Sequence, residues 1–161
     1  MKEILTYQGH VVQVDDDDYE TLATFKWTSK RTRCSGFYAT RTLSTLEDQS
    51  NDRLMHRMIL QPRKDQVVDH IDGNSLNNQR SNLRICTSKQ NSWNSNRNST
   101  KVSGLPKGVV WRRVNQKYLA QIYVNGHKYY LGNHDTKEEA AHAYNKAAIK
   151  YFGEFARLNP L

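Results

Sequence analysis

The chain has 161 residues, enough for one or two small domains with modest apolar cores. Its formal net charge of +8 favours a polyanionic partner, and its two cysteines, Cys34 and Cys86, exclude a four-cysteine zinc site. No stretch approaches the 18 apolar residues of a membrane span, so we expect a soluble, cytoplasmic protein that does not bind membranes.

Residues 1–53 are expected to form a β/α scaffold. Two short apolar runs at 4–7 and 11–14, separated by a turn at Gly9, predict a pair of strands. The acidic run at 15–18 is interpreted as a helix start rather than a metal loop, because aspartate suits the cap and first turn of a helix. Trp27 is assigned to the buried face of that helix. A further strand is expected at 36–41, followed by a polar surface loop at 44–53.

The stretch LMHRMIL, residues 54–60, predicts a short amphipathic helix. His56 lies within it and is interpreted as a packing or hydrogen-bonding residue, with a role near a phosphate as the alternative. Arg57 is left open between a phosphate contact and a solvated charge. Both positions are basic side chains in a segment, 53–100, whose net charge is +5.

The most informative segment is residues 67–93, in which two strands are expected to enclose a loop rich in turn residues. An apolar run at 67–71 predicts the first strand, residues 83–87 the second, and Thr87 or Ser88 is a suitable N-cap for a helix to about Asn96. The order strand, loop, strand, helix would bring the end of the first strand beside the first turns of the helix.

Four side chains in this segment suit phosphodiester hydrolysis. His70 titrates near neutral pH and is a suitable general base for water. Asp69 and Asn91 offer hard oxygen donors, which fit Mg²⁺ or Mn²⁺ better than zinc. Asn82 is interpreted as accepting from one nitrogen of His70 and so orienting the ring.

The pattern DHIDGNxxxN, the SNLR segment and the register of Asn91 resemble the active site of phage-type HNH homing endonucleases. This resemblance implies the ββα-metal fold and the same roles: His70 as base, Asp69 and Asn91 as ligands of one divalent ion, and Asn82 orienting His70. It also implies cleavage to 5′-phosphate and 3′-hydroxyl ends. Some members of the family carry structural zinc, for which this chain lacks the ligands.

Residues 97–106 are expected to be a linker, because the surrounding stretch is rich in Ser, Asn and Gly and has no periodicity. Beyond it, three strands are predicted at 109–114, 118–124 and 128–131, with a hairpin turn at Asn125-Gly126. Thr136 to Glu139 forms a capping box for a helix that stops at Gly153.

Residues 107–159 resemble the Apetala (ethylene-response-factor) type of DNA-binding domain. The resemblance depends on residues such as Gly108-Val109, Leu131-Gly132, Glu139-Ala140-Ala141 and Asn159. It implies a sheet that lies in the major groove. Alternation along the strands places Leu119 on the outward face, and Trp111, Tyr129 and Leu131 on the inward one. The family's DNA-contacting positions correspond to Arg112, Gln121, Tyr123, Lys128 and Tyr130, whereas Val110 departs from the arginine usual there.

Taken together, the sequence predicts an α+β DNA endonuclease with four parts: a scaffold at 1–53, a nuclease core at 54–96, a linker at 97–106 and a double-stranded-DNA-binding domain at 107–161. One active site would nick one strand at a time, and a monomer is slightly favoured. A non-catalytic DNA-binding regulator with an HNH remnant is the alternative. An RNA-binding protein is a third class, disfavoured by an outward sheet face without Phe or Trp.

Overall fold

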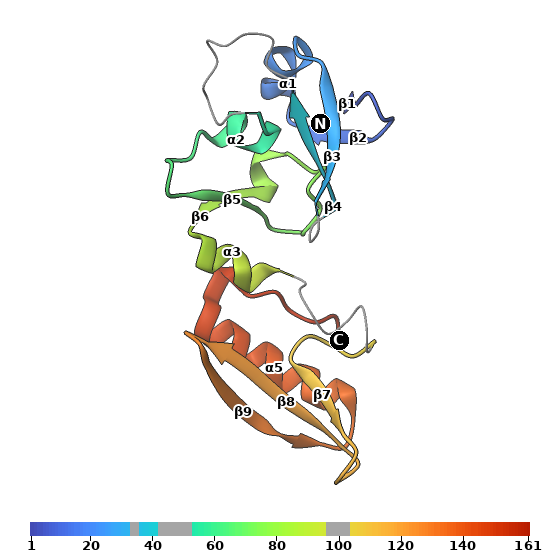
Figure 1. Ribbon diagram of the computed structural model, residues 1–161, viewed down its shortest axis with the longest axis vertical. Coiled ribbons are helices and arrows are strands. Elements are labelled where there is room, and N and C mark those ends of the chain that lie inside the picture. The colour runs from blue at the N-terminus through green and yellow to red at the C-terminus, as the bar shows by residue number, and fades with distance from the viewer. Residues whose placement is uncertain (33–35, 42–52, 96–103) are drawn as a thin grey trace. The chain divides into compact units, whose positions relative to one another are not determined.

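The computed structural model describes residues 1–32, 36–41, 53–95 and 104–161 (Figure 1). Cys34, most of the expected loop at 44–53 and residues 97–103 of the expected linker lie outside these ranges. The described residues form small antiparallel sheets and helices, which confirms the expected α+β class. They divide into two compact units, Met1–Asn91 and Ser92–Leu161. The division falls inside helix α3 (Ser88–Asn94), a few residues before the boundary that the sequence suggests.

The first unit begins with two hairpins and a helix. Strand β1 (Lys2–Leu5) pairs with β2 (Val11–Val14), helix α1 spans Asp16–Ala23, and β3 (Trp27–Thr32) pairs with β4 (Gly36–Arg41). The acidic run therefore does start a helix. Trp27 was expected to belong to that helix, but it is the first residue of β3. Its indole Nε1 donates to the Leu22 carbonyl at 2.8 Å, so the ring still packs beneath α1.

The remainder of the first unit has the predicted order of strand, loop, strand and helix. Helix α2 (Met55–Leu60) precedes strand β5 (Val67–His70), which pairs antiparallel with β6 (Leu83–Cys86) and leads into α3. A buried apolar cluster joins these elements to the amino-terminal hairpins. It is formed by Ile4, Val12, Val14, Leu22, Trp27, Ala39, Met55, Ile59, Val68 and Leu83.

The second unit is a three-stranded sheet covered by one long helix (Figure 1). Its strands are β7 (Val109–Arg112), β8 (Lys117–Val124) and β9 (His127–His134), and its helix is α5 (Lys137–Phe152), followed by a short 3₁₀ turn, Gly153–Phe155. Asn125 and Gly126 both have positive φ, as the predicted hairpin turn requires.

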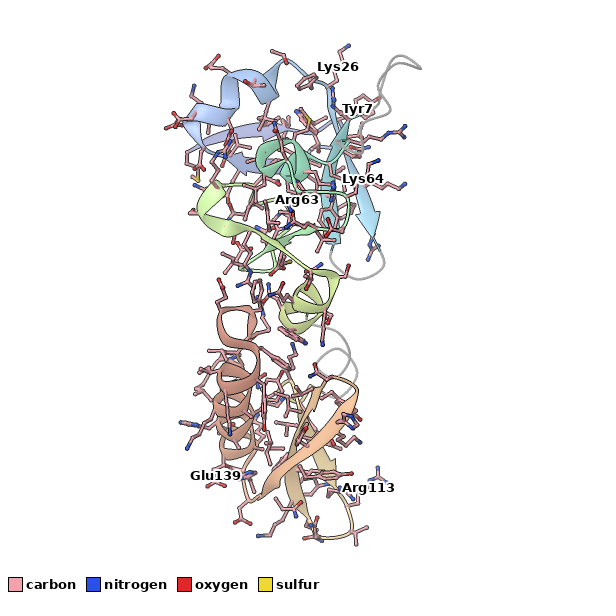
Figure 2. The ribbon with its side chains drawn as sticks, turned by 90° about the vertical axis from the view of Figure 1, so that its left-hand side faces the viewer. Tyr7, Lys26, Arg63, Lys64, Arg113 and Glu139 are labelled. Carbon is pink, nitrogen blue, oxygen red and sulfur yellow. The ribbon has the colours of Figure 1, made fainter. Side chains whose placement is uncertain are left out.

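The capping box of α5 is formed as the sequence predicts. The Thr136 hydroxyl accepts from the Glu139 backbone N–H at 3.2 Å, and the Glu139 carboxylate accepts from the Thr136 N–H at 3.4 Å. Figure 2 shows Glu139 at the amino-terminal end of the helix. Of the helices that the structure describes, none is both long and apolar enough to cross a membrane.

Small residues let α5 lie close to the sheet. Ala140, Ala141, Ala147 and Ala148 are buried between the helix and strands β7 and β8. Trp93, at the end of α3, belongs to this unit and stacks on Phe152 with ring centroids 4.7 Å apart. The Lys107 ammonium donates to the Trp93 and Ser95 carbonyls at 2.6 and 2.9 Å, which satisfies two carbonyls at the carboxyl-terminal end of that helix.

Candidate functional site

His70 is the last residue of β5 and is buried beside Asn78, Tyr38 and His56. Its ring is 5% exposed, and its Nε2 is 3.4 Å from Asn78 Oδ1. Since an amide oxygen only accepts, Nε2 is the donor in this contact and Nδ1 carries the lone pair. Burial lowers the pKa of His70, opposed by Asn78 and by the charges of Asp72 and Asp69. The neutral ring that results is the form able to accept a proton.

The hydrogen bonds of Asn82 lie within the loop, and its predicted role in orienting His70 stays a prediction. The Asn82 amide donates to the Asp72 carboxylate at 3.0 Å and to the Asn77 carbonyl at 2.8 Å, and its oxygen accepts from the Asp72 N–H at 3.0 Å. These bonds brace the turn that follows β5. Because the loop folds back on itself, Asn78, which is completely buried, lies against His70 instead.

Asn78 was present in the motif but not singled out. It is the second asparagine of the pattern DGNxxxN, four residues after Asn74. This spacing is the signal in the sequence that could have drawn attention to Asn78 beside Asn82.

Asp69 is also buried and is held by an arginine that sequence reasoning missed. The Arg84 Nε and Nη2 atoms donate to Asp69 Oδ2 at 2.9 and 2.7 Å. The two residues are directly opposite in the β5–β6 register, so the pair follows from the hairpin itself. A cross-strand Asp–Arg pair could have been found once the register was assumed.

Asp69 and His70 are adjacent at the end of β5, and the Asp69 charge acts on the His70 ring, but their other neighbours differ. His70 faces β4 and α2, where its ring lies near Tyr38 and His56. Asp69 faces Arg84 and the thiol of Cys86, whose pKa burial raises to about 11, with the Asp69 charge acting in the same direction. The backbone N–H of Asn91 also contacts that thiol, so the contacts bring Asp69 close to the first turns of α3.

The donor chemistry on the Asp69 side of the hairpin fits a hard divalent cation. Asp69 supplies a carboxylate and Asn91 a carboxamide, both oxygen ligands of the kind that Mg²⁺ and Mn²⁺ prefer. Within the described ranges, no group of three His, Cys, Asp or Glu residues is placed so that it could hold a metal ion.

The amino-terminal segment holds the loop that carries Asn78. The Gln13 N–H donates to the Leu76 carbonyl at 2.9 Å, and the Asn78 N–H donates to the Gln13 carbonyl at 2.8 Å. Asp15 accepts from the Arg80 N–H at 2.7 Å, and Asp18 pairs with the Arg80 guanidinium at 2.8 Å. The acidic run therefore has a second task besides starting α1: it fixes the loop from more than sixty residues away.

Arg57 is half-buried rather than displayed on the surface. Its Nη1 donates to the Gln66 carbonyl at 3.2 Å, which ties α2 to the residue preceding β5. Its Nε is buried and has no hydrogen-bond partner within the described part of the chain. The structure therefore shows a contact of Arg57 inside the fold. The sequence allowed two other interpretations, a phosphate contact and a solvated charge.

One face of the second unit's sheet gathers exposed polar and aromatic side chains. Gln121 is opposite Tyr130 and Tyr123 is opposite Lys128, so these four share a face. The Lys128 ammonium lies 5.1 Å from the Tyr123 ring centroid and 5.8 Å from that of Tyr130. The charge of Arg112 also acts on Lys128.

Burial corrects part of the predicted pattern of this sheet. Leu119 was expected to face outward but is only 5% exposed. Leu131 packs against the core, as expected for an inward residue, whereas Tyr129 stacks on Tyr151 of α5 but is 43% exposed. The ring centroids of Trp111 and Tyr118 are 4.6 Å apart, yet Trp111 is 41% exposed, so it lies at the margin of the core.

Comparison with known proteins relates the chain to an HNH family model and to viral proteins. A family model described as HNH endonuclease matches residues 61–93, the segment that contains the β5–β6 hairpin and α3. An uncharacterized HNH endonuclease of Acanthamoeba polyphaga mimivirus is 34% identical over 157 residues, which cover 96% of this chain and 77% of that protein. Protein 3.8 of Escherichia phage T7 is 34% identical over 94 residues, 58% of this chain and 76% of that protein. The chain belongs to the HNH endonuclease family.

Proposed function

We propose that this protein is a metal-dependent DNA endonuclease in which His70 activates water. The observation that supports this most directly is the buried, neutral imidazole at the end of β5, held through Nε2 by Asn78. A base of this kind must be neutral at the working pH and fixed in orientation, and positioned proton transfer contributes roughly 10²- to 10⁴-fold in rate. His70 meets both conditions.

In the proposed reaction, water activated by His70 displaces the 3′ oxygen of a phosphodiester. His70 Nδ1 takes a proton from water as the water oxygen attacks phosphorus. The bond between phosphorus and the 3′ oxygen breaks, the leaving oxygen takes a proton from a second water, and the products are a 5′-phosphate and a 3′-hydroxyl. His70 then gives its added proton back to solvent. Asn78 keeps Nε2 protonated throughout, so Nδ1 remains the nitrogen that accepts.

Asp69 and Asn91 would hold one divalent cation, Mg²⁺ or Mn²⁺. Such an ion supplies charge neutralisation on the phosphate and on the leaving oxygen. Arg84 fixes one oxygen of Asp69, which sets the rotamer of the carboxylate before an ion arrives. Nucleases of the HNH family generally use a divalent metal, and the oxygen donors here suit a hard one.

The second unit would place the nuclease on duplex DNA. Residues 101–161 have a net charge of +6, and the exposed face of the sheet presents Arg112, Gln121, Tyr123, Lys128 and Tyr130. The fold of three strands and one helix is compatible with the Apetala-type resemblance, and a sheet of this kind fits the major groove. The family match ends at Trp93, so this part of the proposal depends on the sheet face itself.

A plasmid assay tests the catalytic proposal. His70→Ala is expected to lower Mg²⁺-dependent nicking of supercoiled DNA by about 10²-fold or more, with DNA affinity unchanged. His10→Ala is a control, because His10 is another histidine of the first unit, half-buried and bonded to Ser29 at 2.8 Å. Asp69→Ala and Asn91→Ala should weaken Mn²⁺ binding as well as cleavage. A His70→Ala protein that nicks at the normal rate would remove His70 from the mechanism.

A further inference from the structure

Three aromatic rings from three separate elements meet on the buried side of His70. Tyr38 comes from β4, His56 from α2 and His70 from β5. The ring centroids of His56 and His70 are 5.1 Å apart, those of Tyr38 and His56 are 5.3 Å apart, and those of Tyr38 and His70 are 5.8 Å apart. Each ring therefore touches the other two, and all three belong to the first unit.

The contacts are edge to face rather than stacked. The His56 and His70 planes cross at 83°, and Tyr38 meets the two histidines at 60° and 62°. In this arrangement the edge of one ring points at the face of the next, which is a favourable geometry for aromatic pairs at such distances. A rotation of the His70 ring about its terminal side-chain torsion would break these contacts.

His56 has the properties of a neutral packing group. It is 5% exposed, and burial lowers its pKa to about 3, with the His70 and Arg57 charges acting in the same direction. It is therefore uncharged at neutral pH. A buried, uncharged ring is poorly suited to touch a phosphate, so any effect on cleavage must pass through its neighbour.

We propose that His56, with Tyr38, is a positioning residue that fixes the plane of the His70 imidazole from its buried side. Asn78 holds the ring at Nε2, and the two aromatic rings restrict its rotation, so Nδ1 keeps one direction. This inference rests on the proposed function of His70, and it assigns a role to a residue whose task the sequence left open. Misplacement of a catalytic group by about 1 Å can lower a rate by about 10²-fold.

Three substitutions at His56 test separately the contributions of its aromatic ring, its volume and its ring nitrogens. His56→Phe keeps an aromatic ring and should hold kcat within about threefold of the unaltered protein. His56→Leu fills the space without a ring, and His56→Ala empties it; both should lower kcat about 10- to 100-fold with little change in KM. Equal losses for Phe and Leu, or a change in KM alone, would overturn the proposal.

A double-mutant cycle tests whether His56 acts through His70. In a His70→Ala background, His56→Leu should lower residual nicking no further, because the group that it positions is gone. Additive losses would show that His56 acts independently and would contradict the positioning role. Tyr38→Phe, which keeps the ring, is expected to behave like the unaltered protein, and Tyr38→Leu like His56→Leu.

A measurement that does not use activity keeps the inference separate from the proposed function. With ¹³C-labelled histidine, NMR relaxation of the His70 ring in the full chain should show an ordered ring in the unaltered and His56→Phe proteins and a mobile ring in His56→Leu. If His70→Ala nicked normally, the proposed function would fail while this arm could still succeed. A His70 ring equally ordered in all three proteins would refute the positioning role.

Discussion

The core beneath α5 and the core around His70 are built from different kinds of side chain. Under α5, the buried residues are mostly alanine and aromatic groups that bring helix and sheet into close contact. Around the β5–β6 hairpin, six polar residues are buried together with the apolar cluster. They are His56, Asp69, His70, Ser75, Asn78 and Asn82.

Buried polar groups destabilise a fold unless they are paired, so a concentration of them indicates a region shaped by something other than stability alone. The hairpin meets this requirement with long-range bonds. Gln13 and Asp15 hold the loop from the amino terminus, and Ser75 donates to the Phe37 carbonyl at 2.7 Å. Among the described residues, the second unit has fewer buried polar side chains, and two of them, Asn145 and Asn159, bond to each other at 2.9 and 2.8 Å.

Gly108 offers the strongest way to disrupt the second unit alone. Its φ is +78°, and an added Cβ would overlap the Tyr144 ring and lie 2.7 Å from the Gln121 carbonyl oxygen. Gly108→Ala is expected to destabilise this unit by about 3 kcal/mol or more, which hydrogen exchange of the β8 amides can measure. Gly126→Ala is the matched control: its φ is +85° with no atom within 4 Å, so the loss should be only about 1–2 kcal/mol.

If the two units are as independent as their separate cores suggest, the amides of β5 and β6 should be unaffected by Gly108→Ala. Equal loss of amide protection in both units would show that they do not unfold independently.

Asn78 and Asn82 separate positioning of the base from bracing of the loop. Asn78→Ala removes the contact to His70 Nε2 and should lower the cleavage rate about tenfold or more. Asn82→Ala leaves Asp72 and the Asn77 carbonyl without a partner amide and should act mainly on stability, by about 1–3 kcal/mol. Thermal denaturation and single-turnover cleavage should be measured on both proteins. A larger rate loss for Asn82→Ala would return the orienting role to Asn82.

How far the sequence predicts the molecule depends on how local each signal is. The Asn125-Gly126 turn and the Thr136–Glu139 capping box were predicted and are present, because each is decided by adjacent residues. Trp27 was assigned to a helix and opens a strand, since its partner β4 follows several residues later. The choice between Asn78 and Asn82 depends on the path of a twelve-residue connection between His70 and Leu83, which propensities do not fix.

Lower pH should destabilise the first unit more than the second. The pKa of His56 is about 3 in the folded protein and about 6.5 when unfolded, so the unfolded state binds more protons between these values. The contribution of His56 to the free energy of unfolding is therefore complete above pH 6.5 and is lost as the pH falls toward 3. At pH 5 the loss from His56 is about 2 kcal/mol, and the lowered pKa of His70 acts in the same direction.

Chemical denaturation at pH 7 and pH 5 measures this dependence, and His56→Phe provides the control because phenylalanine does not titrate. The variant should lose about 2 kcal/mol less stability than the unaltered protein over this range. The same pH dependence in both proteins would mean that His56 is not the buried titrating group.

The smallest expected effect concerns the clamp between the acidic run and the hairpin loop. Asp15→Ala removes the acceptor for the Arg80 N–H and should destabilise the first unit by about 1 kcal/mol, seen as a lower melting temperature. Asp17→Ala changes the net charge equally, but Asp17 is exposed and, among the described residues, acts on Arg80 through its charge rather than through a hydrogen bond, so it should have a smaller effect. Equal decreases in melting temperature for the two variants would mean that the net charge, and not the Asp15–Arg80 hydrogen bond, causes the effect. A larger shift for Asp15, accompanied by slower cleavage, would link the amino-terminal helix to the orientation of Asn78, because Asp15 and Gln13 hold neighbouring parts of one loop.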